Sequence, residues 1–175
     1  MDGKNKTRKI VYTAVMVAII SILSALTVPT PTLVPLTLSV FAVSFSGYFL
    51  GVIGSLLAVG VYIVAGGVGL PIFSGFSGGF GVLLGPTGGF IFGYIPLVIL
   101  SAIGGKLNKP LLEIGLSLVG VTLCHLIGVI QFSLVMGNGI LESFIVVSLP
   151  YLLKDYILVA IAYFCAKRLK KILLK

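Results

Sequence analysis

The chain has 175 residues, of which 58% are hydrophobic and only 9% carry a charge. In typical soluble domains about a quarter of the residues are charged, so this chain has too few polar groups to cover a soluble fold. The net charge of +8 does not indicate a nucleic-acid partner, because the basic residues lie at the ends of apolar runs, where they meet lipid headgroups. Composition therefore predicts an integral membrane protein that contacts a lipid bilayer.

Six apolar runs approach the length of about 20 residues that a membrane-spanning helix needs. The first has the basic start of a signal peptide, but the equally apolar chain beyond it favours an uncleaved helix. Only a tight turn near Gly47 and Gly51 separates the second run from the third. The sixth begins at Ser143 or at Pro150 and ends before Lys167. The first five expected helices are 9–27, 36–50, 52–68, 87–104 and 111–135.

Six helices place both termini on the same side as the loop 105–110. Eleven of the twelve Lys and Arg residues then lie on that side, whereas the loops 28–35, 69–86 and 136–143 contain none. Because cytoplasmic loops carry an excess of Lys and Arg, we expect both termini in the cytoplasm. The fold class is an all-α integral membrane protein, a six-transmembrane-helix bundle that forms one domain over 1–175.

The loop 69–86 and the start of the fourth helix are rich in glycine. Irregular backbone at membrane depth persists only where protein or a water-filled cavity satisfies its polar groups, and glycine lets backbone approach a ligand closely. One interpretation is a binding cavity that opens to the outside. The other is that these glycines allow helices to pack closely, as small residues do in membranes.

Asp155 is the one acid that lies clearly inside an apolar run. An ionisable residue within the membrane is costly and marks a functional site or a paired interior position. Lys154 precedes it, but adjacent helix positions point about 100° apart, so the two need not pair. A helix that begins at Pro150 places Asp155 near the external face, and one that begins at Ser143 places it near the bilayer centre.

Further polar residues lie within the apolar runs, and each is a candidate for ligand binding or for a hydrogen bond between helices. They are Ser39, His125, Gln131 and Tyr151. Cys124 and Cys165 also lie in apolar runs, where we expect isolated residues rather than a disulfide. No phosphate-binding loop and no metal-ligand spacing is present, so neither ATPase activity nor a cofactor is expected.

A short pattern offers an enzymatic alternative. Gly75-Phe76-Ser77-Gly78-Gly79 fits Gly-x-Ser-x-Gly, and with His125 it resembles a rhomboid-type intramembrane serine protease. Catalysis there would need His125 within about 3 Å of the Ser77 hydroxyl. His125 falls in the fifth helix rather than the last, and other features of that family are missing, so this is the minor hypothesis.

The order of several segments resembles the BioY family, the biotin-specific S components of energy-coupling factor (ECF) transporters. The most specific segment is Gly69–Phe90, which contains Gly78-Gly79 and Gly85-Pro86-Thr87-Gly88-Gly89-Phe90. Further matches are Val34–Leu38, Gly47–Gly51, Cys124 with Gly128, Pro150-Tyr151 with Asp155, and Ala14-Val15-Met16-Val17-Ala18. The resemblance covers nearly the whole chain.

This resemblance implies a subunit of the prokaryotic plasma membrane that binds biotin from outside and has no catalytic activity of its own. A transmembrane T subunit and two ATPase subunits would supply the energy. Ala14 and Ala18 match the pattern by which S components dock on the T subunit. Asp155 matches the aspartate that accepts the ureido N–H groups, and backbone N–H groups of the loop 75–89 would hold the carboxylate. Phe76, Phe80 and Tyr151 would wall the apolar part.

The substrate-binding residues that the resemblance suggests are Asp155, Ser77, Ser39, Tyr151, Lys154, Gly78, Gly79, Thr87, His125 and Gln131. Several of them differ from the usual family residues. Ser39 replaces glutamine, Ser77 asparagine, His125 tyrosine and Gln131 tryptophan, and Leu158 stands in the position of a binding lysine. A related carboxylated vitamin such as lipoate is therefore the alternative ligand.

Overall fold

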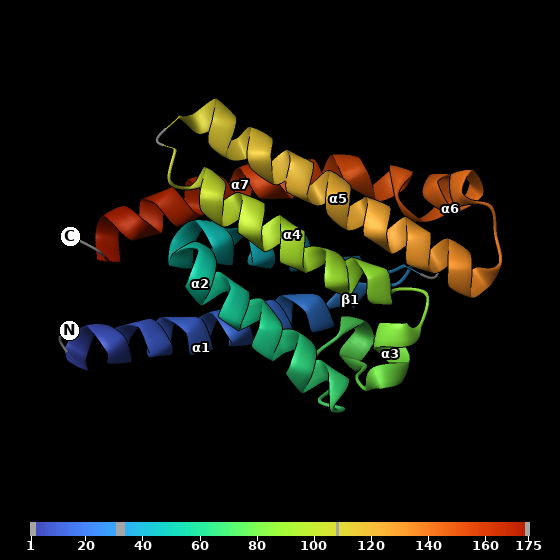
Figure 1. The fold of residues 1–175 in the computed structure, drawn as a ribbon, viewed down its shortest axis with the longest axis horizontal. Coiled ribbons are helices and arrows are strands. Elements are labelled where there is room, and N and C mark those ends of the chain that lie inside the picture. The colour runs from blue at the N-terminus through green and yellow to red at the C-terminus, as the bar shows by residue number, and fades with distance from the viewer. Residues whose placement is uncertain (1–2, 31–33, 108, 174–175) are drawn as a thin grey trace.

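The computed structural model describes residues 3–30, 34–107 and 109–173 as a bundle of long helices (Figure 1). Residues 31–33 of the expected loop 28–35, residue 108 of the loop 105–110 and Lys175 of the basic tail lie outside this description. The elements are α1 Gly3–Ala25, β1 Thr27–Val28, β2 Leu36–Thr37, α2 Ser39–Gly67, the 3₁₀ helix η1 Ser74–Phe76, α3 Phe80–Leu84, α4 Gly88–Gly104, α5 Pro110–Met136, α6 Ile140–Val147 and α7 Leu149–Leu173.

The helix α2 is two arms joined at Gly51. Gly51 has φ 74° and ψ −179°, a backbone conformation open to glycine and strained for residues with a side chain. The chain turns back there, so the two arms diverge like a V in Figure 1. The arms correspond to the second and third helices expected from the sequence, and the tight turn between them falls at Gly51. Gly47 instead packs against α4, where a Cβ would lie 2.9 Å from Ser101 Cβ.

The all-helical membrane class is confirmed. Four helical segments are long and apolar enough to cross a membrane, Lys6–Ala25, Ser39–Gly67, Pro110–Met136 and Leu149–Leu173, and Gly88–Gly104 is a shorter apolar helix. The last helix begins at Leu149, so Pro150 lies in its first turn, where a missing N–H is tolerated. Ser143 belongs to the separate short helix α6, which the sequence analysis did not predict.

Glycines bring the backbones of α4 and α5 into contact. A Cβ added at Gly93 would lie 2.7 Å from Cys124 Cα, and one at Gly89 would lie 2.9 Å from Gly128 Cα. Gly120 faces Leu97 Cα in the same way, at 3.0 Å. Small residues permit such close approach between membrane helices. Glycines therefore join α4 closely to α5, and Gly89 is the residue of the glycine-rich segment that takes part in these contacts.

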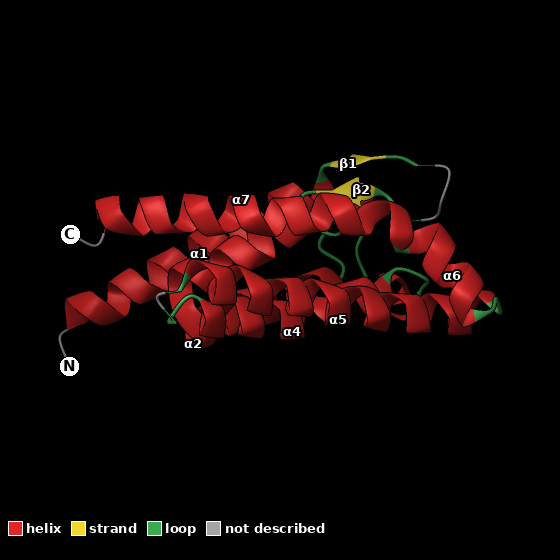
Figure 2. Ribbon diagram, turned by 90° about the horizontal axis from the view of Figure 1, so that it is seen from above, coloured by secondary structure: helices red, strands yellow, loops and turns green. Residues whose placement is uncertain are grey.

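The two ends of the bundle differ. Both termini and the connection from α4 to α5 lie at one end, and the β1–β2 hairpin, α3 and α6 lie at the other (Figures 1 and 2). In the antiparallel hairpin, Thr27 pairs with Thr37 and Val28 with Leu36. The basic residues near the chain termini therefore gather at the end opposite the irregular segments. Short strands, loops and helix starts surround the hairpin end, where backbone polar groups are available to a ligand.

Candidate functional site

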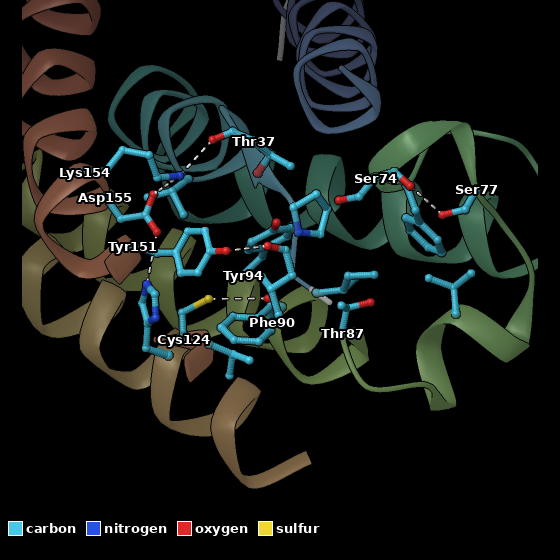
Figure 3. A pocket seen from close by; sticks show the side chains of 18 residues that line it. Thr37, Ser74, Ser77, Thr87, Phe90, Tyr94, Cys124, Tyr151, Lys154 and Asp155 are labelled. Atoms are coloured by element: carbon cyan, nitrogen blue, oxygen red, sulfur yellow. Dashed lines mark hydrogen bonds and ion pairs between the residues drawn. The ribbon is translucent and has the colours of Figure 1, made fainter. Parts of the chain in front are cut away.

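A cavity of about 240 Å³ lies at the hairpin end of the bundle. Its walls come from the segment that enters α2, from the glycine-rich segment, and from α4, α5 and α7. Figure 3 shows Lys154 and Asp155 on one side of the cavity and Ser74 and Ser77 on the other, with Tyr151 between them. The cavity thus combines an ionisable pair, hydroxyl groups and apolar side chains, which is typical of a small-molecule site.

Six of the ten residues expected to bind substrate line this cavity: Asp155, Ser77, Tyr151, Lys154, Thr87 and His125. They come from four separate parts of the chain, and the packing of α4, α5 and α7 brings them together. These residues are far apart in the sequence. Between Thr87 and Asp155, for example, lie the helices α4, α5 and α6. A role for each of them in ligand binding stays a prediction.

Asp155 is the buried acid of the site. It is 4% exposed, and its Oδ1 lies 2.8 Å from the ammonium of Lys154. The sequence left this pairing open, because adjacent helix positions point apart, and in the structure the long Lys154 side chain folds back to reach the carboxylate. Lys154 also donates a hydrogen bond of 2.9 Å to the carbonyl of Thr37. The ion pair is thereby anchored to the hairpin as well as to α7.

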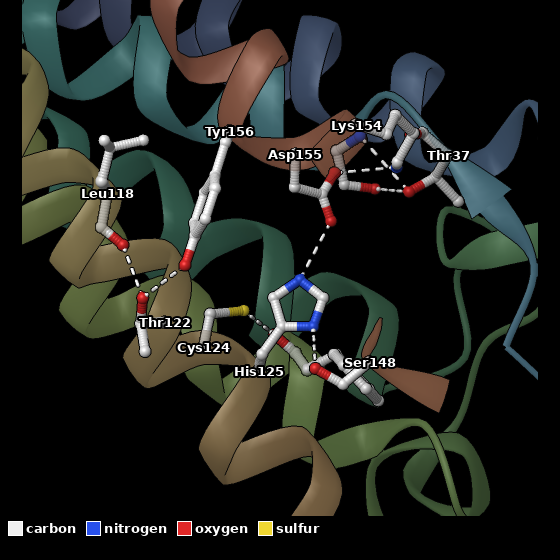
Figure 4. Close-up of polar contacts among 11 residues, drawn as sticks. Thr37, Leu118, Thr122, Cys124, His125, Ser148, Lys154, Asp155 and Tyr156 are labelled. Atoms are coloured by element: carbon white, nitrogen blue, oxygen red, sulfur yellow. Dashed lines mark hydrogen bonds and ion pairs between the residues drawn. The ribbon is translucent and has the colours of Figure 1, made fainter. Parts of the chain in front are cut away.

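His125 on α5 is the second partner of the Asp155 carboxylate. Its Nε2 lies 3.1 Å from Asp155 Oδ2, and its Nδ1 lies 2.9 Å from the hydroxyl of Ser148 (Figure 4). His125 is 3% exposed, and the edge-on Phe90 ring packs against its imidazole with the ring centroids 5.7 Å apart. Both ring nitrogens thus face protein groups, and the two hydrogen bonds join α5 to Ser148 at the α6–α7 junction and to Asp155 in α7.

Tyr151 ties the hairpin to the start of α7. Its hydroxyl donates to the carbonyl of Val34 at 2.7 Å and lies 3.0 Å from the hydroxyl of Thr30. With the Lys154–Thr37 bond, these contacts hold both sides of the hairpin loop against α7 next to the cavity. The first turns of α7 therefore carry the ionisable pair and fasten the segment beside it.

The glycine-rich segment forms the opposite wall through η1 and the start of α4. The Ser77 hydroxyl donates to the carbonyl of Ser74 at 2.8 Å, and Phe73 and Ser77 form an antiparallel bridge. Thr87 stands directly before α4, so the N-terminal end of that helix is adjacent to the cavity. Helix N-termini carry partial positive charge, which favours negatively charged groups.

The other four expected residues lie outside the cavity lining and hold the backbone around it. Ser39 donates to the Thr37 hydroxyl at 2.8 Å, and the Gln131 amide donates to the carbonyls of Leu83 and Gly85, both at 2.8 Å. Gly78 packs directly on the carbonyl of Leu70, and Gly79 has φ 99° with its N–H bonded to Gly66. Direct contact of these four residues with a ligand stays a prediction.

The aromatic side chains of the site differ from those expected. Phe76 and Phe80 are 64% and 66% exposed and point away from the cavity, whereas Phe73 and Phe90 line it. Phe76 and Phe80 were chosen for their place in the glycine-rich segment, but φ values of 68° at Gly75 and 57° at Phe76 turn the backbone and decide which rings face inward. This corrects the expected apolar wall.

Sequence reasoning missed Ser148 altogether. The residue is fully buried at the junction of α6 and α7 and has φ −122° and ψ −54°. A serine near a proline in an apolar run has no distinctive pattern, so no signal in the sequence sets it apart from other serines. Only the packing of the α6–α7 junction against α5 places its hydroxyl next to His125.

A helical membrane protein whose cavity at one end carries an ion pair belongs to the class of membrane-embedded binding proteins. The sequence pattern of the BioY family matches residues 1–175. The chain therefore belongs to the BioY family, which confirms the resemblance drawn from its sequence.

Individual relatives agree with this assignment. The probable biotin transporter BioY of Pyrococcus horikoshii is 33% identical over 166 residues, which cover 94% of this chain and 98% of that protein. The biotin transporter BioY of Thermotoga maritima is 31% identical over 166 residues, with coverages of 94% and 97%. The crystal structure of the S-component for biotin from an ECF-type ABC transporter matches with a TM-score of 0.89 at 27% identity, over 98% of this chain and 95% of that one.

Proposed function

We propose that this protein is the biotin-binding S component of an ECF-type importer and takes up biotin from outside the cell. The names of the relatives and of the matching structure support biotin as the ligand. The observation that carries the assignment in this chain is the Asp155 carboxylate, buried at a cavity and held by two neighbouring side chains. The protein is a substrate-binding subunit and not an enzyme.

The cavity has the groups that biotin needs. Biotin's ureido N–H groups require an acceptor, and Asp155 supplies an anionic one on α7. Its apolar ring and chain suit the walls made by Phe73, Phe90 and Tyr151. Its carboxylate would lie near Thr87 and the start of α4, where backbone N–H groups and the helix dipole favour an anion.

The protease hypothesis is set aside. Ser77 and His125 both line the cavity, but the Ser77 hydroxyl donates to Ser74 and both nitrogens of His125 face Asp155 and Ser148. Nucleophilic catalysis needs the base to face the serine that it activates. Membership of a transporter family gives the second, independent reason.

The membrane topology that we propose has six spans, namely α1, the two arms of α2, α4, α5 and α7. Both termini lie in the cytoplasm, because the basic residues near them and those of the α4–α5 connection share one end of the bundle. The cavity then lies near the outer face of the prokaryotic plasma membrane, which suits capture of a vitamin from outside.

The energy for uptake would come from partners, a transmembrane T subunit and two ATPase subunits. Ala14 and Ala18 are both exposed on α1, whereas Met16 and Ile20 on the same helix are buried in the bundle. The two alanines lie one turn apart on the outer face and allow another helix to approach closely. This face is the docking surface that we propose for the T subunit.

Calorimetric titration of the detergent-purified protein with biotin, and in parallel with lipoate, tests the ligand. We expect tight binding of biotin and a loss of affinity of about tenfold or more in Asp155→Asn, because a charged acceptor in a buried site is replaced by a neutral one. Glu142→Gln, which changes an exposed acid in the first turn of α6, is the matched control and should keep full affinity. Unchanged affinity in Asp155→Asn would remove that residue from the site, and binding of lipoate alone would change the proposed substrate.

Co-purification with the T subunit tests the docking surface. Ala14→Trp and Ala18→Trp should prevent assembly while biotin binding stays normal, because the added rings keep the helices apart without reaching the cavity. Val64→Trp, at an exposed position on α2, serves as the control and should assemble normally. Assembly of both alanine variants with the T subunit would place the docking surface elsewhere.

A further inference from the structure

The two oxygens of the Asp155 carboxylate have different environments. Oδ2 lies 3.1 Å from His125 Nε2 at hydrogen-bonding distance. Oδ1 is ion-paired with Lys154 at 2.8 Å but accepts no hydrogen bond from the part of the chain that the structure describes, although it is buried. A carboxylate oxygen has two lone pairs, so Oδ1 keeps acceptor capacity for an N–H group of a ligand. The direction in which Oδ1 points then depends on what holds Oδ2.

The protonation pattern of His125 follows from its two neighbours. A carboxylate only accepts hydrogen bonds, so His125 must carry its proton on Nε2 to bind Asp155. Lys154 already balances the charge of Asp155, and a second cation in this buried place would lack a counter-charge. An imidazole with its one proton on Nε2 has an acceptor at Nδ1, to which the Ser148 hydroxyl can donate over 2.9 Å.

Ser148 also controls the start of α7 through its backbone. Its carbonyl accepts from the backbone N–H groups of Tyr151 and Leu152, both at 3.0 Å, which makes it the residue that caps this helix. Serine at such a position commonly uses its hydroxyl to accept a helix N–H, but here the hydroxyl is within hydrogen-bonding distance of the histidine. The same residue thus fixes both the beginning of α7 and the orientation of the ring that contacts Asp155.

His125 lines the cavity, but protein groups already occupy both of its ring nitrogens. Its side chain is only 4% exposed, both nitrogens face protein groups, and Phe90 packs edge-on against the ring. Gly128, one turn further along α5, leaves the room that the Phe90 ring occupies, since a Cβ there would lie 2.5 Å from it. The effect of His125 on a ligand must therefore pass through Asp155.

We infer that Ser148 and His125 are positioning residues that orient the Asp155 carboxylate for the N–H donor of the ligand. Ser148 donates to Nδ1 and keeps the proton on Nε2, and Nε2–H holds Oδ2, so that Oδ1 is the oxygen that keeps acceptor capacity beside Lys154. This inference rests on the proposed function for the identity of the ligand. The hydrogen-bonded line from Ser148 through His125 to Asp155 exists without ligand and is tested separately.

The first test uses the single histidine of the chain. With ¹⁵N-histidine label, the imidazole spectrum of the ligand-free protein in detergent at pH 7.5 should show a protonated Nε2 and an unprotonated Nδ1. In Ser148→Ala the Nδ1 resonance should move downfield, as expected for an acceptor nitrogen that loses its donor, while Nε2 stays protonated. A proton on Nδ1 in the wild type, alone or together with one on Nε2, would overturn the inference.

The second test is a double-mutant cycle read by biotin titration. His125→Leu should lower affinity about 30-fold and Ser148→Ala about fivefold, since each removes a buried hydrogen bond behind the charged acceptor. His125→Gln, whose amide can donate to Asp155 and accept from Ser148, should stay within about threefold of the wild type. Ser148→Ala should add no further loss in the His125→Leu background, because Ser148 acts through the ring.

The outcomes distinguish the positioning role of Ser148 and His125 from the proposed function in biotin binding. Additive losses in the double variant, or equal losses in His125→Gln and His125→Leu, would show a general structural role and overturn the inference. If wild-type protein with the expected imidazole spectrum binds no biotin, the proposed function fails while the hydrogen-bonded line stands. Thermal unfolding of each variant checks that the affinities compare folded proteins.

Discussion

The two sides of α5 are held to the bundle by opposite means. Toward α4 the contact consists of backbone against backbone, as at Gly93 and Cys124, where a Cβ would come within 2.7 Å. Toward α7 the contact consists of long polar side chains: Lys167 to Glu113 at 2.7 and 3.0 Å, Tyr156 to Thr122 at 2.9 Å, and His125 to Asp155 at 3.1 Å.

The two sides of α5 show two ways in which helices can be held together in a membrane. Lipid is as apolar as the helix surfaces, so burial of apolar area does little to bring membrane helices together. Close packing at glycines makes the α4–α5 pair rigid and leaves no room for a ligand. Polar side chains span a wider separation between α5 and α7, and at the hairpin end this separation accommodates the cavity. The ligand site therefore includes the polar interface between α5 and α7, and α4 adds Phe90, Ile91 and Tyr94 to its wall.

Removal of one partner of the Lys167–Glu113 ion pair should have the largest effect on stability. Glu113 is 1% exposed, and Lys167→Met would leave its carboxylate buried without a counter-charge, so we expect a loss of about 3 kcal/mol in the free energy of unfolding. Unfolding by SDS in mixed micelles measures this change. The double variant Lys167→Met with Glu113→Gln should recover most of it.

Arg168→Met provides the matched control, because Arg168 is the neighbouring cation and is exposed. It should unfold like the wild type. If Lys167→Met were no less stable than Arg168→Met, the polar interface would not depend on charge and the contrast between the two sides of α5 would be lost.

A methyl group between α4 and α5 should have an intermediate effect. Gly93→Ala forces the backbones apart at Cys124, and overpacking of this kind costs about 2 kcal/mol. Gly115→Ala on α5 adds the same methyl group where no atom lies within 4 Å, so it should be neutral or slightly stabilising. The same SDS titration compares the two, and equal behaviour of both variants would show that the close approach does not limit stability.

The hydrogen bond between Thr122 and Tyr156 should contribute least. Thr122→Val and Tyr156→Phe each remove it, and interhelical hydrogen bonds in membranes are worth about 0.6 kcal/mol. The two single variants and the double variant should therefore lose similar amounts in SDS unfolding. Losses that add in the double variant would indicate that the two hydroxyls act separately.

Much of the architecture was predictable because it depends on local composition. The scarcity of charge predicts a membrane protein, Gly51 and the prolines mark where helices turn or begin, and an acid in an apolar run singles out Asp155. The tight turn at Gly51 and the start of the last helix at Leu149, with Pro150 in its first turn, agree with these local signals. The short helix α6 was missed, because its eight residues continue the apolar character of the chain around it.

The sequence by itself determined the class of protein, the approximate helices and the central acid of the site. Three features depend on the tertiary structure: Lys154 bonds to the Thr37 carbonyl, Phe73 and Phe90 rather than Phe76 and Phe80 line the cavity, and Ser148 meets His125. The physical reason is that hydropathy and helix breakers act within a few residues of one another. A contact between side chains far apart in the chain depends instead on how each helix is rotated and how far it lies from its neighbour, which only the packing of the whole bundle sets.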